Sequence, residues 1–515
     1  MNEENIKYSE VVAYQEKGLV YPENAPFDPD CFFSEYPFGK AHLQTGSGVY
    51  GAVREVLHLA GLDETHYGSE QWNPLGDLVK KGQTVLIKPN WVFHKNGLND
   101  ELFSIITHPS VLRPLVDYAY LAVGKEGKIW IADAPQFNAD YQILRQKLQL
   151  DMLEREMKSR GVPLTIADLR SLIVEMDSGV VVARQYVDTD ASEGVEFDLG
   201  ADSEFAELAD SLKNLFGSDY DRRITCRYHR TSEARQKHCY RISKRVLEAD
   251  LVISVPKLKT HKKTGVTLNI KNMIGINTDK NYIPHYRVGS PGQGGDEFPD
   301  SNQLVKRIKR WLIRHAIDFF LGKSGTTGER IIHRYMQVLL RLKTKKTEEK
   351  AGKRLDPIDV FYRSVQGDRF RTGNWWGNDT TWRAALDINK ILFHGTPRGT
   401  LETRMTRHFF SLIDGITGGD EDGPMAATPR PEGVLVAGFD PVRVDSVAVQ
   451  VMGFDPKRIR DIQKAKQLKK YPIMQTGGEV VVRSNQPQWQ PGIQKGSDLK
   501  FRPHFAWEDY LESDT

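Results

Sequence analysis

The sequence contains very little cysteine. Cys31, Cys226 and Cys239 are the only three in 515 residues, and no two of them form a CxxC pair. Iron–sulfur clusters and structural zinc ions are usually held by such pairs, and a disulfide framework needs more cysteines than these. We therefore expect no iron–sulfur cluster, no zinc ion held by thiolates and no disulfide framework.

Long apolar runs and motifs that name a reaction are also missing. No run of about 18 apolar residues occurs, so no membrane-spanning helix is expected. The first residues, MNEENIKYSEVVAYQEKG, are polar and show no secretory signal. There is no HExxH helix, and GKSGTTGER at 322–330 lacks the residue order of a phosphate-binding loop. We expect a cytoplasmic protein whose chemistry no single motif names.

The chain has little net charge, but the charge is unevenly distributed. The formal net charge is +3, whereas the segment from Asn302 to Arg354 holds 15 Lys and Arg against 4 Asp and Glu. Within it, VKRIKRWLIRHAIDFFLG (305–322) has apolar residues at near-helical spacing. The segment 303–354 either contacts a membrane surface or an acidic protein, or packs as a solvated helix on its own domain. No RNA- or DNA-binding motif accompanies it, so no nucleic acid partner is expected.

Short β-branched runs alternate with helical patterns along the chain. This alternation predicts an α/β fold with a mostly parallel sheet flanked by helices, interrupted by a largely helical insertion. The pattern predicts a helix at 109–124 and strands at 84–90, 128–135, 162–169, 179–187, 250–257, 433–441 and 478–484. We expect an N-terminal extension (1–76), a first α/β part (77–276), a basic and aromatic helical insertion (277–400), and a second α/β part with a C-terminal tail (401–515).

Charged and amide side chains follow four of the predicted strands. They are Lys88 and Asn90, Asp133, the group Lys257, Lys259 and His261, and the pair Asp440 and Asp445. In parallel sheets, ligands bind beyond the carboxyl ends of the strands. A single polar strand exit is explained by solvent, but four together favour a ligand-binding cleft.

The segment VPKLKTHKKTGVTLNIKNMIGI (255–276) holds the densest group of cations next to an apolar strand. Lys257, Lys259 and His261 are two residues apart, so in an extended chain they share one face. Lys271 and Asn272 follow, ahead of Gly275, where a positive φ would be tolerated. This pattern predicts an anion-binding strip, with a solvated basic edge as the alternative.

A carboxylate-rich segment, DGITGGDEDGP, begins at Asp414. Its acids and the later strand exit supply four candidate ligands for magnesium or a similar divalent cation: Asp414, Glu421, Asp440 and Asp445. The spacing does not match an EF-hand loop. For Asp440 the alternative is a helix N-cap ahead of Pro441, and for Asp414 it is a turn.

Several of these segments together resemble one known family. VLIKPNWV, THPSVLRPLVDYA, IWIADAP, ADLVISVPKLKTHKKTGVTLNIKNMIGI and LIDGITGGDEDGP followed by GVLVAGFDPVRVDSVAVQVMGFDP occur in the order found in the domain of unknown function 362 family. The resemblance covers roughly 80–275 and 405–460. It implies an α/β protein of mostly unassigned role. Some members carry ferredoxin-type cysteine clusters, which this chain lacks, so the resemblance implies no redox role here.

These observations predict an enzyme that acts on a phosphorylated or carboxylated small molecule, with a divalent cation as a candidate cofactor. The predicted catalytic residues are His261, Lys259 and Lys271. The predicted substrate-binding residues are Lys88, Asn90, His108, Asp133, Lys257, Asn272, Asp387 and Asn389. Two alternatives stay open: a racemase or epimerase that uses Lys and His as an acid–base pair, and a non-catalytic scaffold attached through 303–354.

Overall fold

The computed structural model describes most of the chain outside one long central segment. The described residues are 8–44, 48–177, 180–208, 215–217, 225, 227–232, 235–300, 372–475, 478–490 and 498–511, with single positions at 331, 334, 337, 338, 342, 492, 493 and 496. The basic tract 303–354 and the GKSGTTGER segment therefore lie almost wholly outside the described residues.

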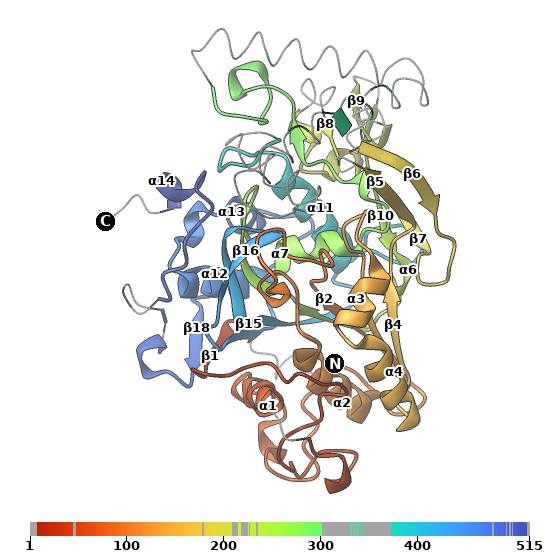
Figure 1. The fold of residues 1–515 in the computed structure, drawn as a ribbon, viewed down its shortest axis with the longest axis vertical. Helices are drawn as coiled ribbons and strands as arrows, with labels where there is room; N and C mark the ends of the chain where they lie inside the picture. Colours follow the sequence, from red (N-terminus) through yellow and green to blue (C-terminus); the bar gives the residue numbers. More distant parts are fainter. Residues whose placement is uncertain are drawn as a thin grey trace.

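One large mixed sheet forms the centre of the molecule (Figure 1). Its strands follow the order β18-β1-β17-β15-β11-β2-β3-β4. The run from β15 to β4 is parallel, whereas β17 pairs antiparallel with both β15 and β1. The bounds are β1 (Glu10–Gln15), β2 (Thr84–Pro89), β3 (Lys128–Asp133), β4 (Leu164–Asp168), β11 (Leu251–Val255), β15 (His408–Asp422), β17 (Val434–Gly438) and β18 (Val481–Ser484).

Helices cover both faces of this sheet because its strands alternate apolar side chains between the two faces. In β2, Val85 and Ile87 belong to one buried cluster and Leu86 to the other. The first cluster includes α1 (Val49–Leu59) and α2 (Pro109–Val123); the second includes α7 (Asn269–Asn272), α11 (Thr381–His394), α12 (Pro441–Met452) and α13 (Arg460–Ala465). Figure 1 shows α1 and α2 below the sheet and the second set above it. The predicted α/β class is confirmed.

The remaining helices and strands surround this core. The other helices are α3 (Tyr141–Lys147), α4 (Leu150–Ser159), α6 (Lys244–Leu247) and α14 (Glu508–Leu511). Three small sheets pair β7 (Gly194–Asp198), β10 (Arg235–Ser243) and β9 (His229–Ser232); β14 (Tyr286–Arg287) and β8 (Leu215–Phe216); and β5 (Leu172–Asp177) and β6 (Val180–Tyr186). The predicted strand at 179–187 is β6, outside the main sheet.

Short strands extend the main sheet at the edge where the predicted cations lie. β12 (Lys257–His261) pairs with β13 (Gly265–Thr267) and with the far half of β15, which also pairs with β16 (Ala426–Arg430). The glycines of β15 permit this close packing: a Cβ on Gly419 would lie 2.3 Å from the Ser104 carbonyl oxygen. The basic segment is therefore a buried strand pair rather than a surface loop.

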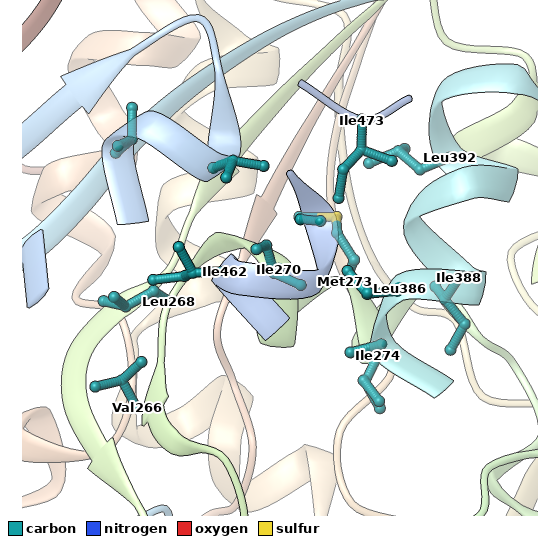
Figure 2. Close-up of a cluster of buried hydrophobic side chains, with 14 of the residues drawn as sticks. Val266, Leu268, Ile270, Met273, Ile274, Leu386, Ile388, Leu392, Ile462 and Ile473 are labelled. Atoms are coloured by element: carbon teal, nitrogen blue, oxygen red, sulfur yellow. The ribbon is translucent and has the colours of Figure 1, made fainter. Parts of the chain in front are cut away.

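Two segments outside the predicted α/β parts contribute to the core. β1 lies between β17 and β18, so residues 10–15 of the predicted N-terminal extension belong to the main sheet. α11, from the predicted insertion, is buried along its whole length and packs against α7 and α13. Figure 2 shows Leu386 of α11 beside Met273 and Leu392 beside Ile473 in this cluster. Among the described residues, no helix is long and apolar enough to cross a membrane.

Candidate functional site

The ends of β2 and β3 meet α7 at a buried polar junction. The Lys88 ammonium donates to Asp133 Oδ1 at 2.7 Å and to Asn272 Oδ1 at 3.0 Å. Asn90 donates from Nδ2 to the same Asn272 oxygen at 3.2 Å. The structure thus brings Lys88, Asn90 and Asp133, which the sequence placed after two strands, together with Asn272 from the segment 255–276. Because Asp133 neutralises Lys88, this pair serves to hold the junction together.

Gly275 is required by its contact with this junction. A Cβ at this position would lie 2.1 Å from Asp133 Oδ1 and 2.6 Å from Lys88 Nζ. Gly275 is not among the residues with positive φ, so the reason expected from the sequence is wrong. Close approach of the backbone to a buried ion pair is the physical cause.

A second ion pair joins β12 to β15. Lys257 Nζ donates to Asp414 Oδ2 at 2.9 Å, and both side chains are fully buried. Tyr21, which the sequence analysis did not identify, donates its hydroxyl to Asp414 Oδ1 at 2.6 Å and accepts from Lys257 Nζ at 2.7 Å. The His108 backbone amide also donates to Asp414, at 3.1 Å, and its ring stacks on Tyr21. Lys257 and Asp414 are therefore engaged with each other.

Lys259 is buried without a carboxylate partner. Its ammonium donates to the backbone carbonyls of Ile105 and Pro424 and forms no ion pair among the described residues. Burial, then the neighbouring Lys257 and Lys271, hold its pKa well below the ordinary lysine value. Thr267 lies opposite Lys259 across the β12–β13 pair, and its buried Oγ1 has no partner in the described part of the chain. Lys259 thus keeps its charge uncompensated by a carboxylate, and Thr267 keeps an unused hydroxyl beside it.

Lys271 carries a charge that acts on three other lysines without a carboxylate partner. It is partly buried, and within the described ranges its ammonium has neither a hydrogen bond nor an ion pair. Burial lowers its pKa to about 8. Lys271 in turn contributes to the lowered pKa values of Lys259, Lys263 and Lys280. We call Lys259, Lys263, Lys271 and Lys280 the lysine group.

The other two members of the lysine group escaped the sequence analysis. Lys280 is buried, and its ammonium donates to the carbonyls of Ile274 at 3.2 Å and Asn277 at 3.4 Å. Burial lowers its pKa to about 7. Lys263 is partly buried and donates to the Thr372 carbonyl. Neither forms an ion pair with a described residue. Lys263 stands in a run of lysines and Lys280 in an ordinary polar segment, and neither pattern indicates burial.

His261 is held as a neutral ring beside this group. Its Nδ1 accepts hydrogen bonds from the backbone amides of Lys263 at 3.0 Å and Thr264 at 3.3 Å, so Nε2 carries the proton. Burial, and next the charge of Lys271, hold its pKa well below the usual histidine value. His261 can therefore donate a hydrogen bond from Nε2.

Asp461 is a further acid near the lysine group. It lies at the start of α13, is buried, and accepts the adjacent Ile462 amide at 3.0 Å together with its own backbone amide; no other hydrogen bond or ion pair reaches it from the described residues. Burial raises its pKa to about 7, and the charge of Lys271 opposes that rise. No motif marked this aspartate, because it belongs to the short helical sequence RDIQKA with no carboxylate or glycine pattern around it.

The four predicted metal ligands do not form one group. Within the described part of the chain, no cluster of three or more His, Cys, Asp or Glu side chains is placed to hold a metal ion. Asp440 caps α12 through the amides of Val442 and Arg443, as the alternative reading anticipated. Asp445 accepts the amides of Asn269 and Ile270 at the start of α7.

Glu421, the last of the four, forms an ion pair of 2.7 Å with Arg502 near the surface. Asp414 is engaged by Lys257 and Tyr21, as described above. Each carboxylate is thus bonded to protein donors, and these four residues do not fit a shared magnesium ion.

Asp387 and Asn389 lie on α11, away from the strand exits. Asp387 accepts from Ser203 and from the Tyr240 hydroxyl, and pairs with Lys390 at 3.2 Å. Asn389 donates to the Ile270 carbonyl at 2.8 Å, which ties α11 to α7. Asp387 therefore belongs to a separate buried network, and Asn389 supports the helix that carries Lys271.

Comparison with known proteins gives one match. The model of a family described as "Domain of unknown function (DUF362)" matches residues 176–450. No curated protein matches, and no solved structure matches. The matched range holds the whole lysine group and both β12 and β15.

Proposed function

The chain belongs to the DUF362 family, and we propose that it is an enzyme that acts on a phosphorylated or carboxylated small molecule bound at the lysine group. The family description names no activity. Support for the proposal comes from the charges of this chain's own side chains around Lys271.

The observation that carries the proposal is an excess of enclosed positive charge. The four ammonium groups of the lysine group lack carboxylate partners among the described residues. Removing a cation from water costs several kcal/mol unless a counter-charge compensates it. Lys88 and Lys257 have that compensation from Asp133 and Asp414, whereas the lysine group does not. A bound phosphate or carboxylate would supply it.

Proton transfer is the chemistry that these residues favour. Groups whose pKa lies near the working pH exchange protons most effectively, and Lys271 has a pKa of about 8. His261 presents a neutral ring whose Nε2–H is a hydrogen-bond donor. Lys271 in its neutral form would accept a proton from the ligand, and His261 would donate a hydrogen bond to an oxygen on which negative charge then develops.

A racemase or epimerase is the second candidate, and it is favoured by the proximity of His261 to Lys271. Such an enzyme removes a proton from one face of a carbon and returns one to the other. Exchange of deuterium from the solvent into a bound hydroxy acid or sugar phosphate distinguishes it from other enzymes of anionic substrates.

The other expectations from the sequence stay predictions. These are the cytoplasmic location, the divalent cation and the contact of 303–354 with a membrane or acidic protein. A divalent cation could arrive with the substrate, since the four predicted ligands do not form a site for it.

Isothermal titration calorimetry with inorganic phosphate and with small carboxylates tests the proposal. We expect the wild-type chain to bind at least one of these anions, and Lys259→Met and Lys271→Met to weaken that binding about 10-fold or more, as expected for loss of a charged hydrogen bond. Lys125→Met, at an exposed position, is the matched control and should bind as the wild type does. Absence of binding for every anion would overturn the proposal.

A further inference from the structure

Lys271 and Asp461 carry opposite charges and lie on neighbouring helices, but they do not form an ion pair. They lie on α7 and α13, which pack against each other, and each charge acts on the pKa of the other. No ion pair joins them within 4.0 Å, and neither has another ion-pair partner in the described residues. Two enclosed opposite charges normally move together, because each then compensates the desolvation of the other.

The fold holds the two residues apart. Lys271 lies on α7, whose first amides are bound by Asp445 and whose Ile270 carbonyl accepts from Asn389. Asp461 begins α13, which packs directly against α7. Figure 2 shows Ile462, the next residue, beside Leu268 and Ile270 in the same apolar cluster. Both helices are therefore anchored by buried contacts.

A separation of this kind suits a ligand that bridges the two groups. Lys271 has only donors to offer and ionised Asp461 has only acceptors. A molecule that satisfies both must present an acceptor, such as a phosphate or carboxylate oxygen, and a donor, such as a hydroxyl or amino group. A simple anion satisfies Lys271 alone and would be repelled by Asp461.

Asp445 is the other buried acid near α7, and most of its acceptor capacity is already used. Its two oxygens accept three donors, the amides of Asn269 and Ile270 and the Asn269 side chain at 2.8 Å. Asp461 uses one oxygen for the Ile462 amide and keeps acceptor capacity.

We propose that Asp461 is a ligand-binding residue, which accepts a hydrogen bond from a hydroxyl or amino group of the same small molecule whose anionic group is bound by Lys271. This inference rests on the proposed function and narrows its substrate class to anions that also carry a hydrogen-bond donor, such as hydroxyalkyl phosphates and hydroxy or amino acids.

Calorimetry with matched pairs of anions tests this inference on the full-length chain. The pairs are glycerol 3-phosphate against propyl phosphate, and lactate against propionate, in which one member lacks the donor. We expect the wild type to prefer the hydroxylated member of at least one pair by about 10-fold, the effect of one hydrogen bond to a charged group. Asp461→Ala should abolish that preference and leave binding of inorganic phosphate unchanged or tighter, because a repelling charge is removed.

Two further variants make the result specific. Asp461→Asn keeps the size of the side chain and serves if the alanine variant does not fold; it should reduce the preference without weakening phosphate binding. Asp455→Ala removes a neighbouring aspartate that also caps a short helix, through the Lys457 amide, and should retain the full preference. Anion binding without any preference for a hydroxyl group, or a preference that survives both Asp461 variants, would overturn this inference alone. Failure of every anion to bind would overturn the proposed function as well.

Discussion

The Lys257 ammonium and the Asp414 carboxylate meet at 2.9 Å although 157 positions separate them in the chain. The two residues are direct neighbours across β12 and β15, and water has no access to either side chain. This pair connects the cation-rich strand to the glycine-rich one, and so it fixes the position of Lys259 two residues later.

Removal of one partner of this pair should be far more damaging than removal of both. Lys257→Met leaves Asp414 charged, buried and short of a donor, and we expect a loss of about 3–5 kcal/mol in the free energy of unfolding. Lys257→Met with Asp414→Asn should recover a substantial part of that loss. Urea unfolding followed by circular dichroism measures both. Equal losses in the single and double variants would contradict the coupling.

Gly275→Ala should destabilise the junction beneath the lysine group. The new methyl would overlap the Asp133 carboxylate and the Lys88 ammonium, at 2.1 Å and 2.6 Å. We expect a loss of about 1–3 kcal/mol in the free energy of unfolding, as for other overpacked sites. Gly492→Ala is the control, because a Cβ there meets no atom within 4 Å. A fully stable Gly275→Ala variant would show that the pair can move aside.

Lys271 should make the stability of the protein depend on pH in the alkaline range. Its pKa is 10.5 for an ordinary lysine and about 8 in the fold. Because the folded chain binds this proton less tightly, the stability contribution of neutral Lys271 is present above about pH 10.5 and is lost as pH falls through about 8. Between these values the wild type should gain about 3 kcal/mol relative to Lys271→Met as pH rises.

Unfolding in urea at a series of pH values measures that difference. Subtraction of the Lys271→Met curve removes the contributions of the other lysines and tyrosines. Lys125→Met, compared in the same way, should show no such trend, since its side chain is exposed. A constant difference between the wild type and Lys271→Met across this range would contradict the lowered pKa.

Asp445→Ala should disrupt α7 and not a metal site. Loss of the carboxylate leaves the amides of Asn269 and Ile270 buried without acceptors, which costs about 1–3 kcal/mol for each unsatisfied group. Phosphate binding should weaken as well, because α7 carries Lys271. The loss of stability should be the same with excess magnesium and with EDTA. Ser446→Ala, the next residue of α12, is the control and should cost less than about 1 kcal/mol. A defect that magnesium reverses would restore the metal interpretation.

The strand exits were the most predictable part of the site. Lys88, Asn90 and Asp133 lie within three residues of a strand end, and the carboxyl ends of parallel neighbours lie at one edge of the sheet. The helix at 109–124 was also predictable from its apolar spacing and from Pro109 and Gly124 at its ends. In both cases the prediction depends on residues close together in the sequence and on a rule that holds for strands and helices in general.

The partners of the charges were not predictable in the same way. A carboxylate in a glycine-rich segment suggests a metal ligand whether its true neighbour is a cation, as for Asp414, or a helix N-terminus, as for Asp445. Asp461 and Tyr21 carry no pattern at all, since each reaches the site from a segment that looks ordinary in sequence.

Local periodicity by itself determined the α/β class, the principal strands and the gathering of polar residues at one sheet edge, because those depend on neighbours a few residues apart. Only the tertiary structure decided which lysines are neutralised and which are left for a ligand. That distinction depends on distances of a few ångströms between residues more than a hundred positions apart. The sequence around a charged residue does not indicate which distant residue will be its partner.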